Sequence, residues 1–258
     1  MDIAQLRPYC SNFFENVDLQ AHDSRLPGTN LANWISGVCC RTIMKVISVN
    51  VGLPRDVNWQ GRVVRTSIWK NPVGGRIRVS KLNLEGDQQS DLSVHGGADK
   101  AVYAYPSEHY SYWRNALADI ELPWGAFGEN FTTDGILEDQ VRVGDRLQIG
   151  SAEFIVTQPR MPCFKLGIRF NRMDMVKRFL KSKRTGFYFA VLREGEVGAG
   201  DAIHFKDRQE DGLTIADIVN LYTVDSENQE LLRRATQLPA LPAGWKDYFR
   251  KRLWDADS

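Results

Sequence analysis

Cysteine is scarce in this sequence, and its spacing excludes two common uses of the residue. The 258 residues contain Cys10, the adjacent Cys39 and Cys40, and Cys163, with no CxxC pair. A disulfide framework is typical of short secreted chains with regularly spaced cysteines, and an iron–sulfur cluster needs four thiolates at tight spacings. We therefore expect neither, and we expect a reducing, cytoplasmic location.

Other features that are missing narrow the class of protein further. The formal net charge is only +1, so we do not expect a dedicated nucleic-acid binder. The N-terminal stretch MDIAQLRPYC has no apolar core of signal-peptide length, and no apolar run reaches the roughly 18 residues of a membrane span. No glycine-rich dinucleotide fingerprint lies between a strand and a helix. What remains is a globular composition, with 43% hydrophobic and 25% charged residues.

The pattern divides the chain into three parts. Residues 1–43 have weak periodicity, and we treat them as an extension of unknown role. Over 44–206, strand-like segments such as MKVISVNVG, DRLQIG and AEFIVTQ alternate with turns, and PSEHYSYWRNAL and NRMDMVKRFLKSKRTG read as helices. The last two of those strands should form a hairpin at Gly150 and Ser151. This part is predicted to be a mainly β barrel or sandwich with a few flanking helices.

The third part, residues 207–258, is predicted to be a small three-helix bundle. Its first helix begins behind Thr214, with Asp217 three residues later as in a capping box. The tail has seven basic and nine acidic residues from Arg208 onward. Because an acidic tail repels phosphate backbones, we expect it to form a protein-docking or dimer surface rather than to bind nucleic acid.

Basic residues gather in two blocks of the sequence. Between Asp56 and Glu85 there are six bases and no acid, and from Arg160 to Arg184 nine bases accompany the single acid Asp174. If the blocks share one cleft, its natural ligand is an anion such as phosphate, whose oxygens match guanidinium groups. The alternative is that both blocks are solvated surface.

Cys163 lies in QPRMPCFKL, where two neighbouring bases could make its thiol reactive. Pro159 and Pro162 stiffen the segment, and Arg160 and Lys165 favour the thiolate. One cysteine cannot hold a metal alone, but it can be the single protein ligand of a soft metal that an organic cofactor already chelates. The alternative is a buried, inert thiol.

Turn-like sequence with glycine and ionisable residues occurs twice near predicted strands. The first stretch is LEGDQQSDLSVHGGADKAVY and the second is FGENFTTDG. Glycine permits close approach of backbone to a ligand, and loops on a rigid scaffold often carry function. Tight hairpins would also require these glycines, so a purely structural role is the alternative.

Four segments together resemble one protein family. LEGDQQSDLSVHGGADKAVYAYPSEHYSYW, FGENFTTDG, VRVGDRLQIG and QPRMPCFKL occur in the order found in the MOSC family, named for the C-terminal domain of molybdenum cofactor sulfurases. The resemblance covers about residues 44–206, and the tail from Gly212 to Leu253 resembles the three-helix segment of the bacterial YiiM-type proteins. It implies a MOSC-type β-barrel that binds molybdenum cofactor, a pterin that carries a dithiolene-held metal and an anionic phosphate.

The resemblance also implies an activity and residue roles. Members of this type reduce N-hydroxylated compounds, including hydroxylaminopurine-like base analogues, to amines, and the electrons would come from a separate reductase. Cys163 matches the family's cysteine and would complete the molybdenum coordination, with His95 or Asp87 as proton donor. The expected cofactor contacts are Lys81, Glu85, Gly86, Gly96, Gly97, Lys100, Gly128, Glu129, Asn130 and Arg160. The alternative function is a carrier that holds sulfur as a Cys163 persulfide, or holds the cofactor, without turnover.

Overall fold

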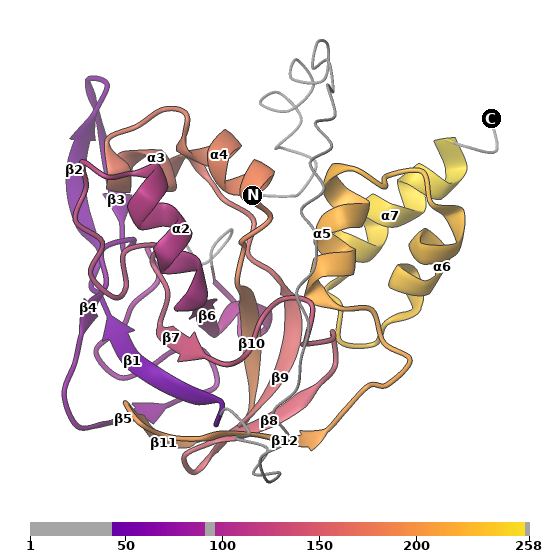
Figure 1. Ribbon diagram of the computed structural model, residues 1–258, viewed down its shortest axis with the longest axis horizontal. Coiled ribbons are helices and arrows are strands. Elements are labelled where there is room, and N and C mark those ends of the chain that lie inside the picture. The colour runs from indigo at the N-terminus through magenta and orange to yellow at the C-terminus, as the bar shows by residue number, and fades with distance from the viewer. Residues whose placement is uncertain (1–42, 91–95, 256–258) are drawn as a thin grey trace, which may run out of the picture.

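The computed structural model describes residues 43–90 and 96–255, and within them eight strands form one large sheet (Figure 1). The spatial order is β12–β8–β9–β10–β6–β7–β1–β4, and every neighbouring pair is antiparallel except β6 and β7. In chain order the strands are β1 (Lys45–Val51), β4 (Asn71–Pro72), β6 (Val102–Pro106), β7 (Phe131–Asp134), β8 (Arg146–Ile149), β9 (Ala152–Pro159), β10 (Phe187–Arg193) and β12 (Ile203–Asp207). Except for Ile43, the expected N-terminal extension lies outside the described residues.

The hairpin expected at Gly150 and Ser151 is present and joins β8 to β9. Ile149 lies opposite Ala152 across the turn, and Gly150 has a positive φ of 57°. Glycine adopts this left-handed conformation without the steric cost that a Cβ would add.

The mainly β fold is confirmed, but among the described residues the sheet does not close into a complete barrel. It curls until the start of β1 meets the segment before β12, where Val46 N donates to Asp201 O at 2.9 Å and Ile203 N donates to Met44 O at 2.8 Å. Farther along, the same edge of β1 pairs with β4 instead, at Asn50 and Val51. Because two short segments share this edge, no continuous ladder joins β12 to β1.

Two small ribbons and four helical segments surround the sheet. β2 (Arg55–Trp59) and β3 (Arg62–Thr66) form a hairpin, and β5 (Arg76–Val79) pairs with β11 (Gly195–Gly198). The helical segments are η2 (Ala98–Lys100), α2 (Glu108–Ala116), α3 (Phe164–Phe170) and α4 (Met175–Ser182). The helices α2 and α4 were expected, whereas α3 was not.

The helices α2, α3 and α4 lie together over one side of the sheet (Figure 1) and enclose an aromatic cluster. Tyr105 of β6 packs against Phe127 at a ring distance of 4.7 Å and stacks on Phe179 of α4 at 6.1 Å. Trp113 of α2 donates its indole N–H to the Tyr105 hydroxyl at 2.7 Å. This cluster fixes the helices against the sheet and supports the loop that follows β9.

The tail forms the three expected helices, α5 (Ile215–Thr223), α6 (Gln229–Gln237) and α7 (Ala243–Asp255). The capping box at the start of α5 is complete, because Asp217 N donates to Thr214 Oγ1 and Thr214 N donates to the Asp217 carboxylate. Ile215, Trp245 and Phe249 belong to the same hydrophobic cluster as the sheet interior. The tail and the sheet therefore share one core. None of the helices in the described parts of the chain is both long and apolar enough to cross a membrane.

Candidate functional site

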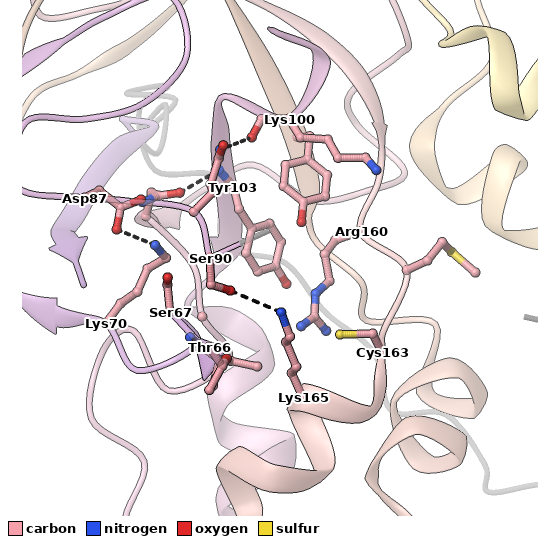
Figure 2. Close-up of a pocket in the computed structure, with 16 residues that line it drawn as sticks. Thr66, Ser67, Lys70, Asp87, Ser90, Lys100, Tyr103, Arg160, Cys163 and Lys165 are labelled. Atoms are coloured by element: carbon pink, nitrogen blue, oxygen red, sulfur yellow. Dashed lines mark hydrogen bonds and ion pairs between the residues drawn. The ribbon is translucent and has the colours of Figure 1, made fainter. Parts of the chain in front are cut away.

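A pocket opens beside the sheet where segments far apart in the sequence converge (Figure 2). The end of β3 and the segment 67–70 form one wall, and the segment 160–165, which runs from β9 into α3, forms another. Between them lie the chain around 87–90, the end of η2 and residues 128 and 130. Four cationic side chains line this pocket, namely Lys70, Lys100, Arg160 and Lys165.

Cys163 lies in this pocket immediately before α3. Its backbone is extended, with φ −121° and ψ 172°, and its carbonyl accepts a hydrogen bond from Leu166 N at 2.9 Å. Pro159 and Pro162 fix φ on either side of the short loop, so the loop has little freedom. The thiol is half-buried, and its sulfur points toward the Arg160 guanidinium in Figure 2. A ligand that enters the pocket can therefore reach the sulfur.

Arg160 is the most enclosed of the four cations, at 6% exposure. Its guanidinium lies over the rings of Tyr103 and Phe179, at 5.5 and 5.1 Å from the centroids. Burial disfavours its charge, but interactions with Tyr103, Tyr188 and the Cys163 thiol outweigh that effect and raise the pKa of Arg160. Its Nη1 is buried without a hydrogen-bond partner. A buried guanidinium nitrogen without an acceptor is an unsatisfied hydrogen-bond donor, and an anionic ligand in the pocket would supply the acceptor.

Lys165 and Lys100 approach the pocket from two different segments. Lys165, on α3, donates to Ser90 Oγ at 3.1 Å and is 8% exposed. Lys100 ends η2, and burial lowers its pKa, an effect that the charges of Asp99 and Cys163 partly oppose. Together with Arg160, these residues make one side of the pocket strongly cationic.

Asp87 also lines the pocket, and hydrogen bonds hold it tightly. Its carboxylate accepts from Gly52 N at 2.8 Å, from Asn130 Nδ2 at 2.9 Å and from Lys70 Nζ at 2.5 Å. The side chains of Lys70 and Asp87 are 8% and 2% exposed. Asp87 is therefore an anchor that fixes Lys70 and Asn130, and its charge offsets that of Lys70.

Glu129 lies next to the pocket but does not line it. Its buried carboxylate accepts hydrogen bonds from Tyr110 Oη, Gly125 N, Phe127 N and Thr132 Oγ1. Burial raises the pKa of Glu129, and these donors oppose the shift. Its role here is to hold the turn that carries Gly128 and Asn130. Gly128 itself lines the pocket with a φ of 82°, a conformation that favours glycine.

Several residues proposed as cofactor contacts lie away from the pocket. Lys81 Nζ donates to the carbonyls of Val191 and Leu192, at 3.1 and 2.5 Å. Glu85 and Gly86 are exposed in the turn after Leu84, and Gly96 and Gly97 precede η2 without joining the pocket wall. His95 lies outside the described residues. The structure thus gathers Cys163, Asp87, Lys100, Gly128, Asn130 and Arg160. The proposed contacts among the described residues that do not line the pocket with them are Lys81, Glu85, Gly86, Gly96, Gly97 and Glu129.

The two basic blocks of the sequence do meet, but only in part. Lys70 from the first block lies with Arg160 and Lys165 from the second. Most other members are elsewhere; for example, Arg76 pairs with Asp201 at 3.0 Å. Sequence reasoning did not single out Ser67, Tyr103 or Tyr188, which also line the pocket. No local motif marks them, because they reach the site only through the curl of the sheet.

Two family models match the chain on either side of residue 207. The model described as MOSC domain matches residues 91–204, and the model described as YiiM-like, 3-alpha helix domain matches residues 213–254. The first covers the segments with Lys100, Arg160 and Cys163, and the second covers α5 to α7.

Individual proteins match over most of their length. The uncharacterized protein YflK of Bacillus subtilis is 37% identical over 207 residues, which cover 80% of this chain and 93% of that protein. Protein YiiM of Escherichia coli is 33% identical over 189 residues, which cover 72% and 84%. The crystal structure of YiiM from Geobacillus stearothermophilus has a TM-score of 0.69 at 36% identity and covers 81% of this chain and 99% of that one.

One further relative carries a functional name. A protein of Gibberella moniliformis named Reductase is 31% identical over 182 residues, which cover 69% of this chain but only 32% of that protein. The two family models together cover most strands of the sheet and the helical tail. The chain therefore belongs to the MOSC domain family and carries the YiiM-like three-helix domain.

Proposed function

We propose that the pocket binds molybdenum cofactor and that the protein reduces N-hydroxylated compounds, such as hydroxylaminopurine-like base analogues, to amines. The observation that carries the proposal is the placement of Cys163 in a pocket with Lys100, Arg160 and Lys165 around it. A soft metal prefers a thiolate ligand, and an anionic phosphate prefers guanidinium and ammonium donors. One pocket of this protein supplies both.

Unmet hydrogen-bonding groups in the pocket fit an anionic ligand. Arg160 Nη1 and Ser67 Oγ are both buried without a partner, and both residues line the pocket. Phosphate and pterin oxygens are acceptors that would satisfy such donors. The donor set on the protein therefore fits a cofactor that brings its own metal ligands and leaves one position for Cys163.

The residues divide into three roles under this proposal. The Cys163 sulfur is the protein ligand to the metal, while Arg160, Lys100 and Lys165 neutralise the anionic part of the cofactor. Asp87, which also accepts from Asn130, holds Lys70 at the opposite wall. When bound, the cofactor would supply a metal that exchanges two electrons with the N–O group of the substrate, and the protein sets the ligand and orients the substrate. Because the Asp87 carboxylate already accepts three hydrogen bonds, it is not the proton donor in this proposal.

The proposal is tested by metal analysis of protein made in a host that synthesises the pterin. Wild-type protein is expected to contain molybdenum and pterin, and Cys163→Ser is expected to lose most of the molybdenum while remaining folded. Cys10→Ser is the matched control and should retain it. Equal molybdenum in wild type and Cys163→Ser would contradict the assigned ligand. A stable extra sulfur on Cys163 without metal, seen by mass spectrometry, would favour the carrier function instead.

The electron source is a separate reductase in this proposal. Loaded protein should reduce a hydroxylamino purine only when a reductase and its nicotinamide nucleotide are both supplied. Turnover with the nucleotide alone would show that no partner is needed.

A further inference from the structure

The position of Lys100 depends on the short turn η2, and two side chains of β9 hold that turn. Thr157 Oγ1 donates to the carbonyl of Asp99 at 2.7 Å, and Gln158 Nε2 donates to the same carbonyl at 3.3 Å. Adjacent residues of a regular strand point to opposite faces. Here the pairing with β10 shifts between Tyr188 and Phe189, and such a bulge lets both side chains reach one acceptor.

Gln158 is in turn held by the helical tail. Trp245 of α7 donates its indole N–H to Gln158 Oε1 at 2.9 Å, and both residues are buried, at 1% and 4% exposure. The amide of Gln158 thus accepts from the tail with its oxygen and donates to the pocket turn with its nitrogen. The indole bond also decides which way the amide faces, because a reversed amide would place its NH₂ against the indole N–H.

We propose that Trp245 is a positioning residue that sets the location of Lys100 in the pocket through the Gln158 amide and the Asp99 carbonyl. Through these contacts the three-helix tail influences the electrostatic potential at Cys163, although none of the described residues that line the pocket belongs to the tail. The inference rests on the proposed function only for the identity of the bound ligand. The effect of the Lys100 charge can be measured through the reactivity of Cys163 in protein without cofactor.

The measurement is the ratio of two alkylation rates at Cys163, followed on its peptide by mass spectrometry in protein without cofactor. Iodoacetate is an anion and iodoacetamide is neutral, while both react with the thiolate. The thiolate fraction therefore cancels in the ratio, which reports the local positive potential. Lys100→Gln is expected to lower the ratio about fivefold, the size of a single charge interaction across a partly solvated pocket.

Trp245→Phe keeps an aromatic ring in the core, and it removes the indole N–H together with part of the ring. It is expected to lower the ratio about twofold, and Gln158→Met, which removes both links, should lower it about two- to threefold. The double variant Trp245→Phe, Gln158→Met should have the same ratio as Gln158→Met alone. The double variant Trp245→Phe, Lys100→Gln should likewise have the same ratio as Lys100→Gln alone. Gln158→Met also keeps the test open if the tryptophan variant does not fold.

Tyr248→Phe is the matched control in the same helix. It removes the hydroxyl that accepts a hydrogen bond from Arg252 Nε at 2.9 Å, and it should leave the ratio unchanged. A wild-type ratio in folded Trp245→Phe and Gln158→Met, or an equal fall in Tyr248→Phe, would overturn the proposal, as would a wild-type ratio in Lys100→Gln. Molybdenum content is measured in a separate experiment. If the proposed function is wrong, the wild-type protein will contain no molybdenum, but the ratio of alkylation rates can still be measured and still tests the role of Trp245.

Discussion

Asp87→Asn is expected to destabilise the protein strongly, because it leaves a buried lysine without its counter-ion. The side chains of Lys70 and Asp87 are 8% and 2% exposed, and their charged atoms are 2.5 Å apart. Removing one partner of a buried ion pair typically costs about 3–5 kcal/mol. The new amide also turns a donor toward one of the three groups that now donate to the carboxylate. We expect the free energy of unfolding to fall by about 3–5 kcal/mol at pH 7.

Urea denaturation followed by tryptophan fluorescence measures this change. Asp247→Asn is the control, because the Asp247–Arg250 pair is 63% and 53% exposed, and its loss should cost less than about 1 kcal/mol. The double variant Lys70→Met, Asp87→Asn should recover much of the stability, since no buried charge is left unpaired. A loss in Asp87→Asn no larger than in Asp247→Asn would refute this account of the site.

Three other changes follow from described contacts. Glu129→Gln should lower the free energy of unfolding by about 2–4 kcal/mol, because an NH₂ group replaces one carboxylate oxygen that faces hydrogen-bond donors. Chemical denaturation measures this change, and an unchanged midpoint would contradict the role given to Glu129. Thr214→Ala should cost about 1 kcal/mol by removing the cap of α5, seen as a lower midpoint in the same assay. Thr236→Ala, within α6 and not at its N-cap, serves as the control. Arg160→Met should lower the affinity for inorganic phosphate at least tenfold, as measured by calorimetry, with Arg76→Met unchanged; equal binding in both variants would show that phosphate does not use the pocket.

Short sequence patterns correctly predicted the parts of the fold that depend only on residues close together in the sequence. The turn at Gly150 and the cap at Thr214 are each determined within a few positions, and both are present. Helix α3 was not predicted, since FKLGIRF contains a glycine and is only seven residues long. Its burial in the aromatic cluster, through Leu166 and Phe170, outweighs the weak local preference.

The site residues could be predicted only where several chemically suitable side chains lie close together in one short sequence motif. Cys163, Arg160 and Lys165 lie in the short segment 160–165, which also contains Pro162, and the structure places all three in the pocket. Lys81 has the same charge as Lys70 and belongs to the same basic block, yet it donates to carbonyls of β10. Nothing local distinguishes these two lysines. The difference arises because Asp87 returns to meet Lys70, a contact that depends on tertiary structure.

The contact between the start of β1 and the segment at 200–203 has a consequence for synthesis of the chain. β1 leaves the ribosome first among the described strands, but Val46 meets Asp201 only after nearly the whole sheet has been made. Until then the start of this strand edge stays unpaired, although Asn50 and Val51 can already pair with β4, and an unpaired edge invites misassociation. Contacts so distant in sequence also slow folding. The nascent chain should therefore be exposed to misassociation at this edge until β12 is available.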